Sequence, residues 1–332
     1  MKNLKEYIIE GIFDTDEDTI DESIKDQIKR FLKNNFKGTS SCKISDKPNA
    51  NGKYEVSSSK DIEVKHDDIT SLTNGLFIWT TVGGGFYCSD CYSLTSLEGA
   101  PKEVGKDFIC GYCDLLTSLK GAPEKVGRDF DCSCCESLKN LKGAPEKVGE
   151  NFICYTCKSL ESLEGAPEKV ERHFDCMRCE SLESLKGAPK KINVDFDCAS
   201  CKSLVSLEGA PEKVGNMFIC VNCRSLKNLK GAPKEVGEDF DCHSCSNLTS
   251  LEGAPEKVDK DFKCVNNKLI SLKGGPKEVG INFYCSNCSK LKSLKGGPEQ
   301  IEGSAYIKNC GKKFTENDLD KSNIKVNDEI YL

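Results

Sequence analysis

Paired cysteines are the residues of this sequence that could do chemistry. The chain has 22 cysteines in 332 residues, and most of them come as Cys-x-x-Cys, for example Cys110 with Cys113 and Cys132 with Cys135. Two such pairs separated by about 18 residues have the ligand spacing of a zinc ribbon, in which four thiolates hold one Zn²⁺. The same pairs could instead form disulfides, or stay as thiols that fill a protein core.

The cysteine pairs belong to a tandem repeat with a period of 22 residues. One unit reads Phe130-Asp-Cys132-Ser-Cys-Cys135-Glu-Ser-Leu138-Lys-Asn-Leu141-Lys-Gly-Ala-Pro-Glu-Lys-Val-Gly. A period of this length predicts a solenoid, in which each unit buries its apolar side only against its neighbours. The phenylalanines that open the units are Phe86, Phe108, Phe130, Phe152, Phe174, Phe196, Phe218, Phe240, Phe262 and Phe283.

The repeat favours buried thiols over metal ligands. Nearly every unit has the pair, every unit supplies its own apolar residues, and one unit carries Asn267 in place of the second cysteine without losing the motif. The charged first residues do not form a secretory signal, so a reducing compartment is expected, where thiols stay free. We therefore predict no metal and no cofactor, with a zinc-rich array or disulfides as the alternatives. Cys134 lies between the two repeated cysteine positions of its unit and is expected to be exposed.

The unit Phe-x-Cys-x-x-Cys-x-x-Leu-x-x-Leu resembles the leucine-rich repeat, whose pattern is L-x-L-x-x-N/C-x-L. The resemblance covers residues 62–310. It implies that Phe and the first Cys point inward from a short strand, and that the second Cys takes the position usually held by Asn. Asn267 stands at that position in a unit one residue shorter, so Cys and Asn are predicted to be structural alternatives. The expected structural ladder consists of Cys88, Cys110, Cys132, Cys154, Cys176, Cys198, Cys220, Cys242, Cys264, Asn267 and Cys285.

These features predict a mostly β repeat solenoid with a leucine-rich-repeat-like parallel sheet. The return segments contain Gly-Ala-Pro, which predicts a thin, turn-rich back and gentler curvature than in helix-backed solenoids. Four parts are expected: a short helical N-terminal arm over residues 1–38, a β-rich entry cap with a degenerate repeat over 43–85, the solenoid over 86–304, and a C-terminal cap over 305–332.

The two ends of the chain allow more local predictions. The arm is expected to be separate from the rest, with Asp21 capping a helix after a solvated acidic stretch. Tyr54-Glu-Val56 and Ile62-Glu-Val64 flank Ser57-Ser-Ser-Lys-Asp, which predicts a hairpin. Residues 314–319 predict a capped helical turn, and Ile324-Lys-Val326 a last strand.

The positions that vary between units predict a binding surface on the strand face. Carboxylates beside exposed Ile and Tyr would suit a basic, partly apolar protein partner. The alternative is that Asp only makes turn hydrogen bonds and that Ile only favours strands. The predicted partner-binding residues are Asp107, Ile109, Tyr112, Asp129, Asp131, Ile153, Tyr155, Asp175, Met177, Asp195, Asp197, Ile219, Asp239 and Asp241.

Composition argues against several other classes of function. The net charge of −6 comes from interleaved Glu and Lys, so no basic footprint for nucleic acid is present. No apolar run is long enough to span a membrane. Three histidines in non-equivalent units and the lack of a phosphate-binding loop argue against an enzyme. A monomeric, cytoplasmic protein of a bacterium or of an infected host cell is expected.

The N-terminal segment Met1-Lys-Asn-Leu-Lys-Glu-Tyr-Ile-Ile-Glu10-Gly11 resembles the capsid-targeting peptides on internal head proteins of large tailed bacteriophages. In that family a protease cuts after Glu in an Ile/Leu-x-Glu motif, so the resemblance implies cleavage between Glu10 and Gly11. It also implies a virion protein, packaged through this peptide, as an alternative to a protein-binding module. An ordinary amphipathic helix is the simpler interpretation.

Overall fold

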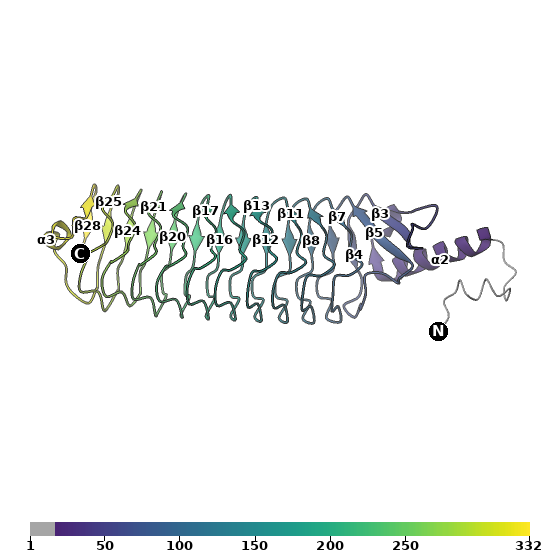
Figure 1. Cartoon of the computed structure of the whole chain (residues 1–332), viewed down its shortest axis with the longest axis horizontal. Helices are drawn as coiled ribbons and strands as arrows, with labels where there is room; N and C mark the ends of the chain where they lie inside the picture. The colour runs from purple at the N-terminus through teal and green to yellow at the C-terminus, as the bar shows by residue number, and fades with distance from the viewer. Residues whose placement is uncertain (1–16) are drawn as a thin grey trace.

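The computed structural model describes residues 17–332, with side chains from residue 23 onward. The chain winds into an elongated body with little curvature, the N-terminal helix at one end and the C-terminus at the other (Figure 1). Each repeat unit makes one coil with a short strand on each of two sides. The predicted parallel β-solenoid is therefore confirmed, and the gentle curvature agrees with a back that contains no helices among the described coils.

Phe-x-Cys segments stack in register to form the first sheet. Phe174 lies opposite Phe196 and Asp175 opposite Asp197, and the same register is kept along the body. This sheet has 14 strands, parallel except for β1 (Phe36–Lys37), which pairs antiparallel with β4. Its other strands are β4 (Ile62–Val64), β6 (Phe86–Tyr87), β8 (Phe108–Ile109), β10 (Phe130–Asp131), β12 (Phe152–Ile153), β14 (Phe174–Asp175), β16 (Phe196–Asp197), β18 (Phe218–Ile219), β20 (Phe240–Asp241), β22 (Phe262–Lys263), β24 (Phe283–Tyr284), β26 (Ala305–Tyr306) and β28 (Ile330–Tyr331).

The back of the solenoid also forms strands, which the prediction of a turn-rich back missed. In the repeat units an exposed Lys or Glu, or the half-buried Gln300, precedes a buried Val or Ile, the alternation of a half-buried strand. The strands join a six-stranded and an eight-stranded sheet that meet between β11 and β13. They are β2 (Cys42–Ile44), β3 (Tyr54–Ser58), β5 (Phe77–Val82), β7 (Glu103–Val104), β9 (Lys125–Val126), β11 (Lys147–Val148), β13 (Lys169–Val170), β15 (Lys191–Ile192), β17 (Lys213–Val214), β19 (Glu235–Val236), β21 (Lys257–Val258), β23 (Glu278–Val279), β25 (Gln300–Ile301) and β27 (Lys325–Val326).

A continuous column of phenylalanine rings fills the space between the 14-stranded sheet and the two sheets of the back. From Phe86 to Phe283 each ring lies 5.1–5.8 Å from the next, and most neighbouring rings are stacked nearly parallel. The ten rings and both cysteines and leucines of an ordinary unit are fully buried, apart from slight exposure of Leu294. The predicted inward direction of Phe and the first Cys is confirmed.

The N-terminal helix differs from its prediction in two respects. Helix α2 (Glu17–Asn35) begins four residues before Asp21, consistent with acidic residues being favourable in a first helical turn. Its Ile28 and Leu32 are buried in the common core, so the described part of the arm is packed on the cap and is not detached. The division of the chain into four parts otherwise stays a prediction.

The predicted hairpin is wrong. β3 pairs with β2 and β5, whereas β4 belongs to the other sheet and pairs with β1 and β6. The residues between β3 and β4 carry the chain from one side of a coil to the other. The two segments are therefore opposite sides of one coil instead of neighbours in a sheet.

The C-terminal end closes with a short helix. α3 (Glu316–Asp320) confirms the predicted capped helical turn, and the Thr315 backbone N–H at its start donates to Asp318 at 2.9 Å. Phe314 and Leu319 bury their side chains against the last coils. A short 3₁₀ turn over Thr39–Ser41 completes the elements.

Candidate functional site

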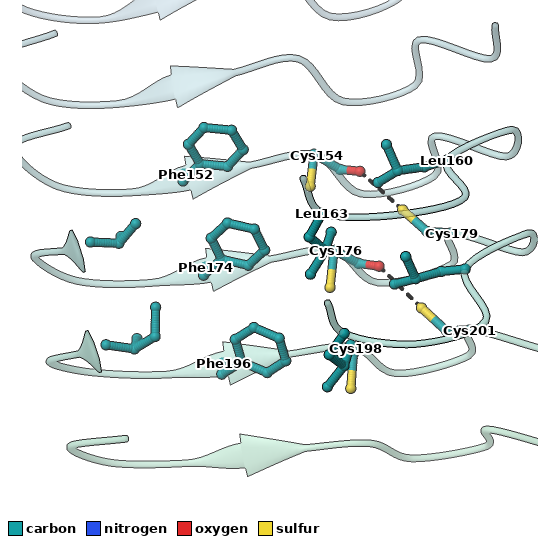
Figure 2. Packing of buried hydrophobic residues seen from close by; sticks show 14 of the residues in the cluster. Phe152, Cys154, Leu160, Leu163, Phe174, Cys176, Cys179, Phe196, Cys198 and Cys201 are labelled. Carbon is teal, nitrogen blue, oxygen red and sulfur yellow. Dashed lines mark hydrogen bonds between the residues drawn. The ribbon is translucent and has the colours of Figure 1, made fainter. Parts of the chain in front are cut away.

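The paired cysteines form a ladder of weak hydrogen bonds between coils. The thiol of the second cysteine donates to the backbone carbonyl of the first cysteine in the preceding coil, as from Cys179 Sγ to Cys154 O and from Cys201 Sγ to Cys176 O, both at 3.3 Å. Figure 2 shows these two bonds beside the phenylalanine column. This use of the second cysteine satisfies a buried acceptor and requires a protonated sulfur.

Asn267 takes the same place and makes the same kind of contact. Its Nδ2 donates to Cys242 O at 3.1 Å and to Cys264 O at 3.0 Å. The equivalence of Cys and Asn at this position is confirmed. The amide makes two bonds where the thiol makes one, although the buried Oδ1 of Asn267 has no partner.

Burial disfavours ionisation of the ladder thiols. Desolvation raises the pKa of Cys264 to about 12, and burial raises the pKa of Cys88, Cys132 and Cys198 well above the usual thiol range. A neutral thiol is a poor nucleophile and a poor metal ligand. Within the described part of the chain, no three His, Cys, Asp or Glu side chains are grouped so that they could hold a metal ion.

The row of residues just before each Phe is acidic, and it is built into the backbone. A carboxylate or amide oxygen in one coil accepts the backbone N–H of the equivalent residue in the next coil. Examples are Asn151 N to Asp129 Oδ1 at 3.0 Å and Met217 N to Asp195 Oδ1 at 3.0 Å. Asn151 and Asn282 take the same role as the aspartates. These bonds run between coils and not within a turn, so the half-buried aspartates of this row have a structural role in addition to lying on the strand face.

The row just after each Phe also combines surface and structural roles. Four aspartates each accept the backbone N–H two residues later, as from Ala199 N to Asp197 Oδ1 at 2.7 Å. The isoleucines at this position are half-buried, so neither kind of residue is fully exposed. The aspartates of this row are Asp131, Asp175, Asp197 and Asp241, and the isoleucines are Ile109, Ile153 and Ile219.

Asp197 should make stability depend on pH. Desolvation, assisted by Asp175 and Asp195, raises the pKa of Asp197 to about 6, against the opposing hydrogen bond from Ala199. Between pH of about 4 and 6 the folded state then binds more protons than the unfolded state, so this group lowers stability as pH rises through that window. We expect Asp197→Asn, which keeps the acceptor, to stabilise the protein by on the order of 1–2 kcal/mol at pH 7.5. Urea unfolding at pH 7.5 and at pH 4 measures this, and an equal effect at both pH values would contradict it.

The turn between the paired cysteines carries a row of left-handed residues that the sequence analysis missed. One residue in each coil has φ between 55° and 61°. Its backbone N–H donates to the next coil, as from Tyr112 N to Ser133 O at 2.9 Å. The recurrence of Asn and Asp here was a signal of this conformation. The row, which we call the turn row, comprises Asp90, Tyr112, Cys134, Thr156, Arg178, Ser200, Asn222, Ser244, Asn266, Asn287 and Asn309.

Two histidines pair with carboxylates on the strand face. His173 Nδ1 lies 2.9 Å from Asp195 and His243 Nδ1 lies 2.8 Å from Asp241. The two pairs lie on different coils, and in the described part of the chain neither ring is hydrogen-bonded to a serine or cysteine. A groove lies elsewhere, along the Val and Gly rows of the back between residues 81 and 171. It is lined by turn glycines, by Val, Ala and Pro, and by Lys and Glu of the outer face.

Comparisons with known proteins give one structural likeness. The sequence matches no protein-family model and no curated protein. A crystal structure of a leucine-rich repeat protein from Bacteroides ovatus aligns over 87% of this chain and 89% of that chain, with 14% identity and a TM-score of 0.39. The assignment as a parallel solenoid rests on the strand registers given above.

Two further predictions concern the N-terminal segment and membranes. Glu10 and Gly11, the predicted cleavage site, lie outside the described residues, so the resemblance to a capsid-targeting peptide stays a prediction. Across residues 17–332, neither helix combines the length and the apolar composition that crossing a bilayer requires.

Proposed function

We propose that this chain is a non-enzymatic protein-binding module that uses the strand face of its solenoid. The observation that carries the proposal is the separation between a uniform interior and a variable surface. Every unit from Phe86 onward buries nearly the same Phe, Cys and Leu, whereas the residues on either side of Phe change from coil to coil. A rigid platform with changing side chains suits recognition of an extended protein surface.

The charge of this face supports a basic partner. Asp107, Asp129, Asp195, Asp239 and Asp261 stand on one line along the sheet. Cations pair with this line near its two ends, where Arg128 Nε lies 3.7 Å from Asp107 and Lys263 Nζ contacts both Asp239 and Asp261. The back is different, because Lys and Glu of neighbouring coils pair there, as in Lys125 with Glu103 at 2.6 Å. Such exposed pairs contribute little to stability and leave the back nearly neutral.

The proposal is tested by removing charge without removing the backbone hydrogen bonds. A triple variant, Asp129→Asn with Asp195→Asn and Asp239→Asn, keeps the side-chain acceptors, as Asn151 does naturally. The matched control is Glu124→Gln with Glu146→Gln and Glu212→Gln, which changes the net charge equally on exposed positions of the back.

The two variants and the original chain are used to capture proteins from lysate of the cells that carry the gene. We expect a protein retained by the original chain and by the control to be lost from the triple Asn variant. Equal retention by all three would contradict binding through the strand face.

A further inference from the structure

The turn row changes character along the solenoid. In the C-terminal coils it holds Ser and Asn, and there the side chains bond to one another, as Asn309 Nδ2 does to Asn287 Oδ1 at 3.2 Å. Four consecutive N-terminal coils instead hold Tyr112, Cys134, Thr156 and Arg178 in the same left-handed conformation. Bulky and β-branched residues are disfavoured at positive φ, whereas Asn tolerates it. The left-handed backbone conformation therefore does not explain why these four residue types occur here.

Three exposed apolar side chains gather at the first of these turns, that of Tyr112, and at the turn of the preceding coil. Tyr112 is 48% exposed, Tyr92 49% and Leu115 50%, and they lie on the turns of two adjacent coils. Tyr112 N donates to Ser133 O and Cys134 N donates to Tyr155 O, both at 2.9 Å, so these three turns stack side by side. The Cys134 thiol, and to a lesser degree Tyr155, raises the pKa of Tyr112 to about 12. Tyr92, Tyr112, Leu115 and Tyr155 together form what we call the aromatic corner. Tyrosine and arginine are the residues that most often dominate protein interfaces.

Carboxylates surround the aromatic corner. The hydroxyl of Tyr92 lies 3.4 Å from Asp90 Oδ1, and Asp90, Asp114 and Asp67 all raise the pKa of Tyr92. The cation nearest the corner in sequence, Lys158, is already paired with Glu136. Aromatic faces next to unpaired carboxylates attract cations both by the π-system and by charge.

We infer that the aromatic corner is the centre of the binding surface, and that it takes a protein segment presenting Arg or Lys beside aliphatic side chains. The inference rests on the proposed function and locates it on the coils from Cys88 to Cys157. The aliphatic groups would cover Tyr112 and Leu115, and the cation would lie between Tyr92 and the carboxylates of Asp90 and Asp114.

A peptide of defined composition tests this inference. The probe is a fluorescein-labelled peptide of repeating Arg-Ser-Leu-Ser, which presents Arg and Leu on one face when extended. The same length of Glu-Ser-Leu-Ser and of Arg-Ser-Ser-Ser tests the charge and the aliphatic contribution. Binding to the full chain is followed by fluorescence anisotropy, and thermal unfolding is recorded for each variant.

The decisive variant is Tyr112→Asn, which places the residue of the C-terminal turns in an N-terminal turn. We expect it to weaken binding of the Arg-Ser-Leu-Ser peptide at least tenfold, while its unfolding midpoint stays equal or rises. Val205→Ser removes another exposed apolar side chain, 46% exposed and far along the body, and should change affinity less than twofold. The two control peptides should bind at least tenfold more weakly to the original chain.

Each other outcome overturns the inference. If Tyr112→Asn binds the peptide as well as the original chain does, the corner is not the site. If the triple Asn variant of the strand face loses binding of the peptide while Tyr112→Asn keeps it, the site does not lie at the aromatic corner, but the proposed binding through the strand face stands. If the original chain fails to prefer the Arg-Ser-Leu-Ser peptide, the inferred partner chemistry is wrong.

Discussion

Replacing Phe196 with alanine should lower the free energy of unfolding by about 3–5 kcal/mol. The side chain is fully buried, and its ring stacks on Phe174 at 5.5 Å and on Phe218 at 5.3 Å. The substitution leaves a cavity and also interrupts the column at two stacking contacts, each worth about 0.5–1.5 kcal/mol beyond burial. Alanine does occupy this position at Ala305, but only in the coil next to the C-terminal cap.

Because each coil contacts only its neighbours, the damage from Phe196→Ala should be local. Hydrogen exchange should show faster opening of the coils on either side of residue 196, while coils near the helical cap keep their protection. Phe196→Leu is the matched control, since it keeps most of the apolar volume and should cost less than half as much. A shift of the urea midpoint no larger for Ala than for Leu would contradict a close-packed column.

Substitution of Gly165 by alanine should be about as damaging, with a loss of about 2–5 kcal/mol. Gly165 has φ of +97°, a conformation that costs other L-residues about 1–2 kcal/mol. A Cβ there would also lie 2.5 Å from backbone atoms of Leu141 in the preceding coil, so the coils would have to separate.

A substitution at Gly75 separates the conformational cost of positive φ from the steric cost of the close approach. It has φ of +84°, but a Cβ at this position would meet nothing within 4 Å. Gly75→Ala should therefore show only the conformational cost, and Gly165→Ala the conformational and steric costs together. Comparable unfolding midpoints for the two variants would mean that close approach between coils is unimportant at the Gly-Ala-Pro turn.

The features that recur once in every unit could be predicted from the sequence, because they depend only on how neighbouring coils stack. The period of Phe108, Phe130 and their equivalents determined the sheet, its register and the inward direction of the cysteines. Asn267 stands where other units have the second cysteine, which showed that Asn and Cys share one structural position. These predictions needed no knowledge of how a single coil is shaped.

Local shape within a coil was harder to predict. From β7 onward the strands of the back are only two residues long, as in Lys169–Val170, so no alternating run marks them. The sequence predicts a hairpin for β3 and β4 because a loop of that length also joins paired strands. The left-handed conformation at Tyr112 and Arg178 went unnoticed because these residue types do not indicate it.

The candidate site was predicted in outline, but its chemistry needed coordinates. Asp129 and Asp195 were assigned to a binding surface, and they also bond the backbone of the next coil. Tyr112 and Tyr155 were included in the predicted surface from variability alone. The stacking of their turns, through Tyr112 N to Ser133 O and Cys134 N to Tyr155 O, depends on the contact between coils, which sequence spacing does not give.

The role of sulfur is tested most directly by counting reactive thiols in the native protein. Nineteen of the 22 cysteines are buried, and only Cys42, Cys134 and Cys310 are half-buried. After brief treatment with iodoacetamide, intact mass should show at most three added groups without denaturant and 22 with it, and native mass spectrometry should show no bound zinc. Several zinc ions per chain, or rapid labelling of many ladder cysteines in the folded state, would contradict a core filled by unreactive, metal-free thiols.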